Sequence, residues 1–169
     1  RFLAVATDCT TGRAVYFEKG ACPALFQAVR ASASMPFVSK PVWIDGMPYL
    51  DGGCADKIPY AWALAAGFEK IIVVRTRPTN YRKTGKPKRV KYPAYPLLAA
   101  QLAGSDARYN RQCQELEALE QAGRLVVISP SVDLQVTRLE GDMEKLGRLY
   151  WMGNQDANAQ LERLRTYLV

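Results

Sequence analysis

The strongest constraint on the fold is an alternation of short apolar runs with longer segments of helical spacing. The apolar runs have the length of β-strands and occupy residues 2–6, 14–17, 70–75 and 125–128. Helical patterns lie between them, near residues 23–35, 59–66 and 95–122. This alternation is typical of an α/β fold with a central, mostly parallel sheet flanked by helices.

A β-hairpin is predicted at residues 42–50. Two short extended runs flank Asp45-Gly46, a dipeptide that favours the two-residue turn of a hairpin. Pro48 lacks a backbone N–H, so the second strand is expected to be an edge strand or irregular. The hairpin leads the chain directly into Asp51-Gly52-Gly53.

Turn and cap signals divide the rest of the chain. Asp8 to Gly12 predicts a polar turn, in which Asp8 has a structural role. Pro59 begins a short helix that ends at Gly67, and Asp56 is expected to cap it. Gly104 interrupts the long helical segment at residues 95–122. A stripe spaced i, i+3, i+7 predicts a final helix and consists of Leu161, Leu164 and Leu168.

Composition excludes several classes of site. The 169 residues are 49% hydrophobic and 23% charged, which is typical of a globular domain. The four cysteines form no C-x-x-C pair, so neither a zinc site nor a disulfide scaffold is expected. The chain has no histidine, which excludes a Ser-His-Asp triad within it. A histidine-based metal site within the chain is excluded for the same reason.

The first residues indicate a piece of a larger protein. The chain opens on Arg1 and enters an apolar strand at once, without a signal segment. The expected partner is therefore an N-terminal half of the same protein. The scattered cysteines favour a reducing compartment, and the expected location is cytoplasmic or peripheral to a membrane. Residues 1–130 are predicted to form the main α/β part, and residues 131–169 a helical extension packed on it.

A basic segment accounts for the net charge of +7. Residues 75–91 contain no acidic side chain and eight basic ones: Arg75, Arg77, Arg82, Lys83, Lys86, Lys88, Arg89 and Lys91. The segment can be a solvated loop, or it can attract anionic lipid headgroups through its last six cations. Nucleic acid is the less favoured partner, although tyrosines lie nearby.

Three motifs in fixed order resemble the patatin-like phospholipase family. They are residues 30–37 (RASASMPF), 44–53 (IDGMPYLDGG) and 56–59 (DKIP). Ala6-Thr7-Asp8 upstream and Arg108-Tyr109-Asn110 downstream are also similar to that family. An isolated Asp-Gly-Gly predicts no more than a turn, whereas the ordered set is far more specific.

The resemblance implies part of a three-layer patatin-like fold and a lipid acyl hydrolase, an esterase that uses a Ser/Asp dyad in lipid degradation. Asp51 matches the catalytic aspartate of the family, and Gly52 and Gly53 are expected to support it by allowing a close backbone approach. A carboxylate in a partly desolvated site can accept the serine proton in place of imidazole. The implied substrate is a lipid or other ester, and the implied hydrolase function needs no metal and no cofactor.

The sequence departs from the family pattern at the nucleophile. No G-x-S-x-G elbow occurs, and none of the six serines fits one, so no nucleophile is assigned in this chain. We expect the larger protein to be a hydrolase and this chain alone to be inactive. The alternative is a non-catalytic lipid-surface or regulatory module of the same fold. Cys54 lies near Asp51 but is interpreted as a small buried side chain.

Overall fold

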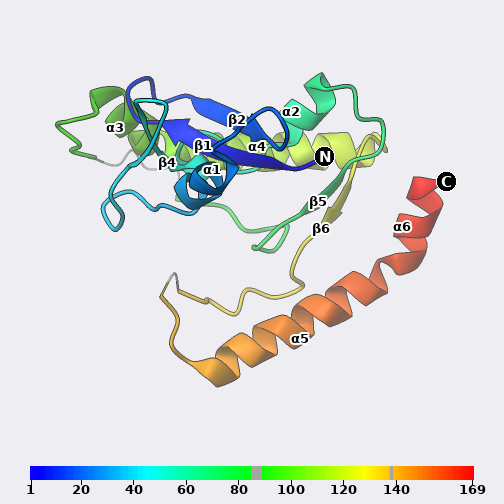
Figure 1. The fold of residues 1–169 in the computed structure, drawn as a ribbon. Coiled ribbons are helices and arrows are strands. Elements are labelled where there is room, and N and C mark those ends of the chain that lie inside the picture. Colours follow the sequence, from blue (N-terminus) through cyan, green and yellow to red (C-terminus); the bar gives the residue numbers. More distant parts are fainter. Residues whose placement is uncertain (85–88, 138) are drawn as a thin grey trace. The chain divides into compact units, whose positions relative to one another are not determined.

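The computed structural model describes residues 1–84, 89–137 and 139–169 (Figure 1). It contains two compact units, each assembled from two stretches of chain. Unit 1 comprises Arg1–Pro59 and Lys83–Asn110, and unit 2 comprises Tyr60–Arg82 and Arg111–Val169. The boundary expected between residues 130 and 131 remains a prediction.

Unit 1 contains a four-stranded sheet in the order β2-β1-β4-β3. Its strands are β1 (Leu3–Asp8), β2 (Ala14–Glu18), β3 (Val42–Ile44) and β4 (Met47–Asp51), and each neighbouring pair is antiparallel. The α/β class is confirmed, but a mostly parallel central sheet is not. Short turns join β1 to β2 and β3 to β4, which makes these two pairs antiparallel, because a parallel crossover needs about a dozen residues. The β3–β4 hairpin follows α1 and adds to the sheet with β4 antiparallel to β1.

The predicted hairpin is present between β3 and β4. Asp45 and Gly46 both have positive φ, at 49° and 76°, as the favoured two-residue turn requires. The prediction that Pro48 makes β4 an edge strand is wrong, because β4 lies between β1 and β3. Pro48 is tolerated there because the ladder with β1 runs over Tyr49–Asp51 and does not include the proline.

Small side chains allow helix α1 (Leu25–Ser32) to pack closely on this sheet. The shared core consists of Ala4, Ala6, Ala28, Ala31, Val42 and Ile44, all at most 6% exposed. Alanine has little volume, so helix and strands can approach without a void. Of the small-residue tract at residues 31–34 (ASAS), Ala31 therefore has a packing role here.

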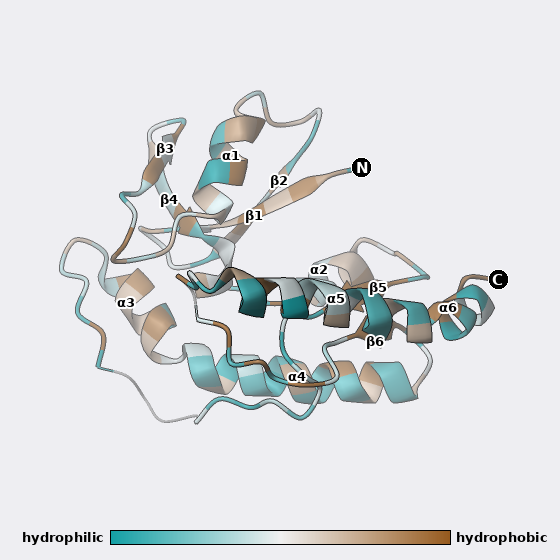
Figure 2. Ribbon diagram, turned by 90° about the horizontal axis from the view of Figure 1, so that it is seen from below, coloured by the Kyte–Doolittle hydropathy of each residue, from teal (hydrophilic) through white to brown (hydrophobic). Residues whose placement is uncertain are grey.

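A second core of unit 1 forms where β4 ends. Cys9, Leu50, Cys54 and Leu98 are its buried members. Leu98 comes from α3 (Pro96–Ala103), which Gly104 separates from α4 (Ser105–Gln121), as the sequence predicts. Figure 2 shows α4 as a largely hydrophilic helix, whereas α3 is mostly apolar. Asp106 in the first turn of α4 is buried and forms an ion pair with Lys83.

Unit 2 contains the predicted strands β5 (Ile72–Val74) and β6 (Val126–Ile128), which pair in parallel. The continuous apolar run around β5 is typical of a strand of a parallel sheet that is buried on both faces. In the structure Ile72 is 40% and Val74 73% exposed, so that prediction is wrong. Within β5 only Val73, whose side chain lies on the opposite face of the strand from Ile72 and Val74, is buried. The run of apolar residues therefore predicts the strand but not the burial of both its faces.

The helices of unit 2 follow the predicted signals in part. Helix α2 (Tyr60–Ala65) follows Pro59, and Gly67 has a φ of 79° just after it. The C-terminal leucine stripe lies in α6 (Leu161–Leu168), which follows a longer helix α5 (Met143–Ala159), and neither helix has a buried residue. Of the helices described, none combines the length and hydrophobicity needed to cross a bilayer.

Candidate active site

Asp51 is held in place through its backbone by three neighbours. Its amide donates to the carbonyl of Ser34 at 2.8 Å, and its carbonyl accepts from Thr7 Oγ1 at 2.8 Å. It also pairs with Ala6 at the end of the β1–β4 ladder. The strand, the small-residue tract and a buried hydroxyl therefore fix the Cα from which the carboxylate projects.

The Asp51 carboxylate is half-buried and caps the short helix that follows. Its Oδ1 accepts from the Gly53 amide at 2.7 Å, at the start of the 3₁₀ helix η1 (Gly52–Cys54). The hairpin before Asp51 and the two glycines after it predict a carboxylate that faces a concave surface and does not act as a cap, and the cap shows that this prediction is wrong. A one-turn 3₁₀ helix leaves amides without partners at its N-terminus, and the nearest side-chain acceptor takes one of them. In the described chain Oδ2 has no hydrogen bond.

The close approach expected at the glycines is present at Gly52. A Cβ at this position would lie 2.4 Å from the carbonyl oxygen of Val5, so only glycine fits without movement of β1. At Gly53 a Cβ would lie 3.1 Å from Asp51 Oδ1. Gly52 therefore allows η1 to pack closely on β1, and Gly53 contacts the Asp51 carboxylate. The role of both glycines in supporting catalysis stays a prediction.

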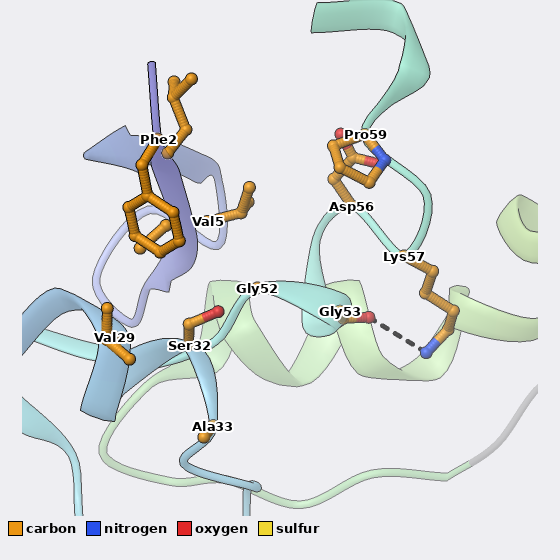
Figure 3. Close-up of a pocket in the computed structure, with 12 residues that line it drawn as sticks. Phe2, Val5, Val29, Ser32, Ala33, Gly52, Gly53, Asp56, Lys57 and Pro59 are labelled. Atoms are coloured by element: carbon orange, nitrogen blue, oxygen red, sulfur yellow. Dashed lines mark hydrogen bonds between the residues drawn. The ribbon is translucent and has the colours of Figure 1, made fainter. Parts of the chain in front are cut away.

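A cavity of about 440 Å³ adjoins this turn (Figure 3). Phe2, Val5 and Val29 form an apolar wall, and Asp56 and Lys57 lie on the opposite side. Gly52 and Gly53 also line it, whereas Asp51 is not among the lining residues. A concave, mostly apolar site with a few polar groups is typical of small-ligand sites, and its volume falls in their range.

Two cationic side chains donate hydrogen bonds to carbonyls of η1, and neither contact was predicted from the sequence. Lys57 Nζ donates to the carbonyl of Gly53 at 3.0 Å, as the dashed line in Figure 3 shows. Arg108 Nη2 donates to the carbonyl of Cys54 at 3.1 Å. Both cations bind carbonyls of the turn, where the negative end of the helix dipole lies. Arg108 was noted in the sequence only as part of the family resemblance.

Asp56 takes part in a contact between strand and turn. Its Oδ2 accepts from the hydroxyl of Tyr16 at 2.5 Å. Burial and this hydrogen bond raise the pKa of Tyr16, so the phenol stays protonated and donates. The sequence suggested Asp56 as a helix cap and offered no sign of a partner on β2.

Asp8 is structural, as the sequence predicts. Its Oδ1 accepts from the Thr10 amide at 2.7 Å and hydroxyl at 2.6 Å and from the Thr11 amide at 3.3 Å, and Oδ2 accepts from the Thr11 hydroxyl at 2.9 Å. Burial alone would raise the pKa of Asp8, but these hydrogen bonds to the charged form outweigh it and lower the pKa.

The cysteines near the turn are buried. Cys54 is 4% exposed, as expected for a small core side chain. Burial, with the negative charge of Asp8 and the neighbouring Cys54, raises the pKa of Cys9 to about 12. A thiol that stays protonated at neutral pH is a poor nucleophile.

The serines near this turn, none of which was assigned as a nucleophile, make other contacts. Ser32 lines the cavity, and the Ser34 hydroxyl donates to the carbonyl of Arg30 at 2.7 Å. In the described residues, no serine hydroxyl hydrogen-bonds to the Asp51 carboxylate. Nor do three His, Cys, Asp or Glu side chains gather there as metal ligands would.

Several cations of the basic segment are already paired. Arg77 binds Asp133 at 2.7 Å, Arg82 binds Glu117 at 2.5 Å, and Lys83 lies 3.4 Å from Asp106. Arg75 is buried and donates to Cys113 Sγ. Arg89 and Lys91 are exposed, whereas Lys86 and Lys88 lie outside the described residues.

Comparison with known proteins identifies the segment that contains this site. Residues 21–64 match the family model of patatin-like phospholipases. The resemblance stated from the sequence is thereby confirmed for the stretch that runs from α1 through β4 and η1 into α2. Residues 95–169 match a second model, a domain of unknown function (DUF6363).

Similar curated proteins include a mycobacterial and an enterobacterial relative. The uncharacterized NTE family protein Rv1063c of Mycobacterium tuberculosis is 42% identical over 60 residues, which are 36% of this chain and 16% of the relative. The uncharacterized protein YjjU of Escherichia coli is 40% identical over 53 residues, 31% of this chain and 15% of the relative. The aligned part thus spans less than a fifth of either relative.

Proposed function

We propose that this chain is part of a patatin-like hydrolase of lipid or other carboxylic esters, with Asp51 as the general base of a Ser/Asp dyad. The observation that carries the proposal is the position of Asp51. It lies inside the patatin-like stretch, at the end of β4, with its backbone fixed and Oδ2 free of hydrogen bonds in the described chain. A carboxylate with an open lone pair can accept a proton.

The chemistry assigned to Asp51 is proton transfer. A serine oxygen attacks the ester carbonyl carbon while its proton passes to the Asp51 carboxylate. The same proton then passes to the alkoxide oxygen as the alcohol leaves and an acyl-serine remains. Water attacks the acyl-serine through the same base, which releases the carboxylic acid and restores the serine. No metal or cofactor takes part in this scheme.

The serine is proposed to come from outside residues 1–169, from another part of the same protein. The edge of β1 supports this arrangement. Its described ladder with β4 covers Ala6–Asp8, whereas Leu3–Val5 pair with β2 alone and border the cavity. Gly52 of η1 packs against Val5, and the edge at Leu3 and Ala4, beside an apolar cavity, is a place where another strand can pair. The chain by itself is then expected to be inactive.

A second candidate is a non-catalytic lipid-surface module of the same fold. The observation in its favour is that Asp51 caps η1 and that no described serine binds it. The proposed contact with anionic lipid headgroups would run through Arg82, Lys83, Lys86, Lys88, Arg89 and Lys91. Arg82 and Lys83 already pair with carboxylates, so the exposed Arg89 and Lys91 carry more of this proposal.

Asp51→Asn in the full-length protein that contains this chain separates the two candidates. The substitution preserves the shape and the cap, but an amide does not accept the serine proton. Hydrolysis of a short-chain aryl ester should fall by roughly 10²- to 10⁴-fold. Asp45→Asn, in the exposed hairpin turn, is the matched control and should retain wild-type turnover. Near-normal turnover of folded Asp51→Asn would contradict the dyad.

A further inference from the structure

Thr7 joins the two ends of the turn that follows Asp51. Its hydroxyl donates to the Asp51 carbonyl at 2.8 Å and accepts from the Ala55 amide at 3.2 Å. The Gly52 carbonyl lies 3.4 Å from the same oxygen, a longer alternative for its single proton. Asp51 and Ala55 are the residues that flank η1 on either side. One buried hydroxyl therefore fixes both ends of the turn to β1.

Because Thr7 is buried, its hydroxyl has these backbone groups and not bulk water as hydrogen-bond partners. The side chain is 0% exposed, so no bulk water can replace the turn as its partner. A buried hydroxyl needs both a donor and an acceptor role filled, and here the Ala55 amide and the Asp51 carbonyl fill them. Valine has nearly the same shape but can fill neither role.

A turn as short as η1 depends on such contacts. Three residues of 3₁₀ helix are not stable by themselves. The Asp51 carboxylate caps this turn, so any movement of η1 also moves the Gly53 amide that orients the carboxylate. Thr7 thus acts on the site through Asp51, without contact with a substrate.

We propose that Thr7 is a positioning residue that holds Asp51 in the orientation needed to accept the serine proton. This inference rests on the proposed function of Asp51. In the full-length protein, Thr7→Val should lower kcat roughly 10- to 100-fold, because small misplacements of a catalytic group have effects of this size. KM should change by less than about 2-fold, because Thr7 does not touch substrate. Thr7→Ser should restore kcat to within about 3-fold of wild type.

A structural measurement accompanies the kinetics. Amide hydrogen exchange at Ala55 and Gly53 should accelerate in Thr7→Val and return toward the wild-type rate in Thr7→Ser. Val127→Ala, a buried substitution in β6 of unit 2, serves as the control for general destabilisation. It should lower the melting temperature without changing kcat or the exchange of these two amides.

The outcomes separate the two proposals. If Asp51→Asn abolishes turnover while Thr7→Val behaves like Val127→Ala, the positioning role is overturned and the dyad stands. If Asp51→Asn retains turnover, the dyad is overturned, and the positioning role with it. A loss of kcat in Thr7→Val that Thr7→Ser does not rescue also contradicts the inference, because the hydroxyl would then not be the group that matters.

Discussion

Asp8 and Asp51 lie at the ends of neighbouring strands, yet their surroundings differ in one decisive way. Asp8 is 8% exposed and accepts four hydrogen bonds from Thr10 and Thr11. Asp51 is half-buried, and its carboxylate accepts one hydrogen bond from the residues that the structure describes, from the Gly53 amide. A carboxylate whose lone pairs are taken by its own turn is a structural group, whereas one with unused acceptor capacity can take a proton from a reacting partner.

The contact between Gly52 and β1 is expected to have the largest effect on stability. Gly52→Ala places a methyl group 2.4 Å from the Val5 carbonyl oxygen, so β1 or η1 must shift. We expect the free energy of unfolding to fall by about 3 kcal/mol, as for an overpacked core. Chemical denaturation of the purified protein measures it.

Gly53→Ala is the matched control for that loss. Its Cβ meets the Asp51 carboxylate at 3.1 Å and no backbone atom outside its own neighbours. The carboxylate can move by a few tenths of an ångström, so the loss should stay below about 1 kcal/mol. Equal losses in the two variants would show that the close approach to Val5 does not decide the need for glycine.

The comparison between the two aspartates predicts unequal losses on removal of the charge. Asp8→Asn weakens several charge-assisted hydrogen bonds at once and should destabilise the fold by about 2 kcal/mol. Asp51→Asn keeps the single cap acceptor and should lose less than about 1 kcal/mol. Thermal unfolding of both variants side by side measures the difference. A larger loss for Asp51→Asn would invert the assignment of structural and functional roles.

The smallest effect concerns acid stability. Because hydrogen bonds lower the pKa of folded Asp8 below that of the unfolded chain, its stabilising contribution is complete above about pH 4. It is lost as the pH falls through the folded pKa, since the unfolded state then binds the proton more readily. Wild type should therefore lose stability faster than Asp8→Asn below pH 4, by at most about 1.4 kcal/mol per pH unit. Parallel slopes in urea titrations at pH 2.5–5 would contradict this account.

Local signals in the sequence were sufficient to predict several turns and helix boundaries of the fold. The Asp45-Gly46 hairpin, the helix break at Gly104 and the polar turn at Asp8 are all present in the structure. Each depends on residues a few positions apart, where backbone preference and side-chain hydrogen bonds act within one turn. The patatin-like motifs likewise lie in a continuous stretch, which the family match at residues 21–64 confirms.

Contacts between residues far apart in the sequence decided the rest. The antiparallel order of the sheet places β4 between β1 and β3, against the expectation from Pro48. The pair between Tyr16 and Asp56 and the hydroxyl of Thr7 at Asp51 join residues about 40 positions apart. No periodicity or turn signal encodes such a pair, because the free energy that selects it comes from burying both partners together. The sequence alone therefore determined which residue types can do chemistry. The tertiary structure decided that Asp8 is satisfied within its turn, while Asp51 Oδ2 accepts no hydrogen bond from residues 1–84, 89–137 and 139–169.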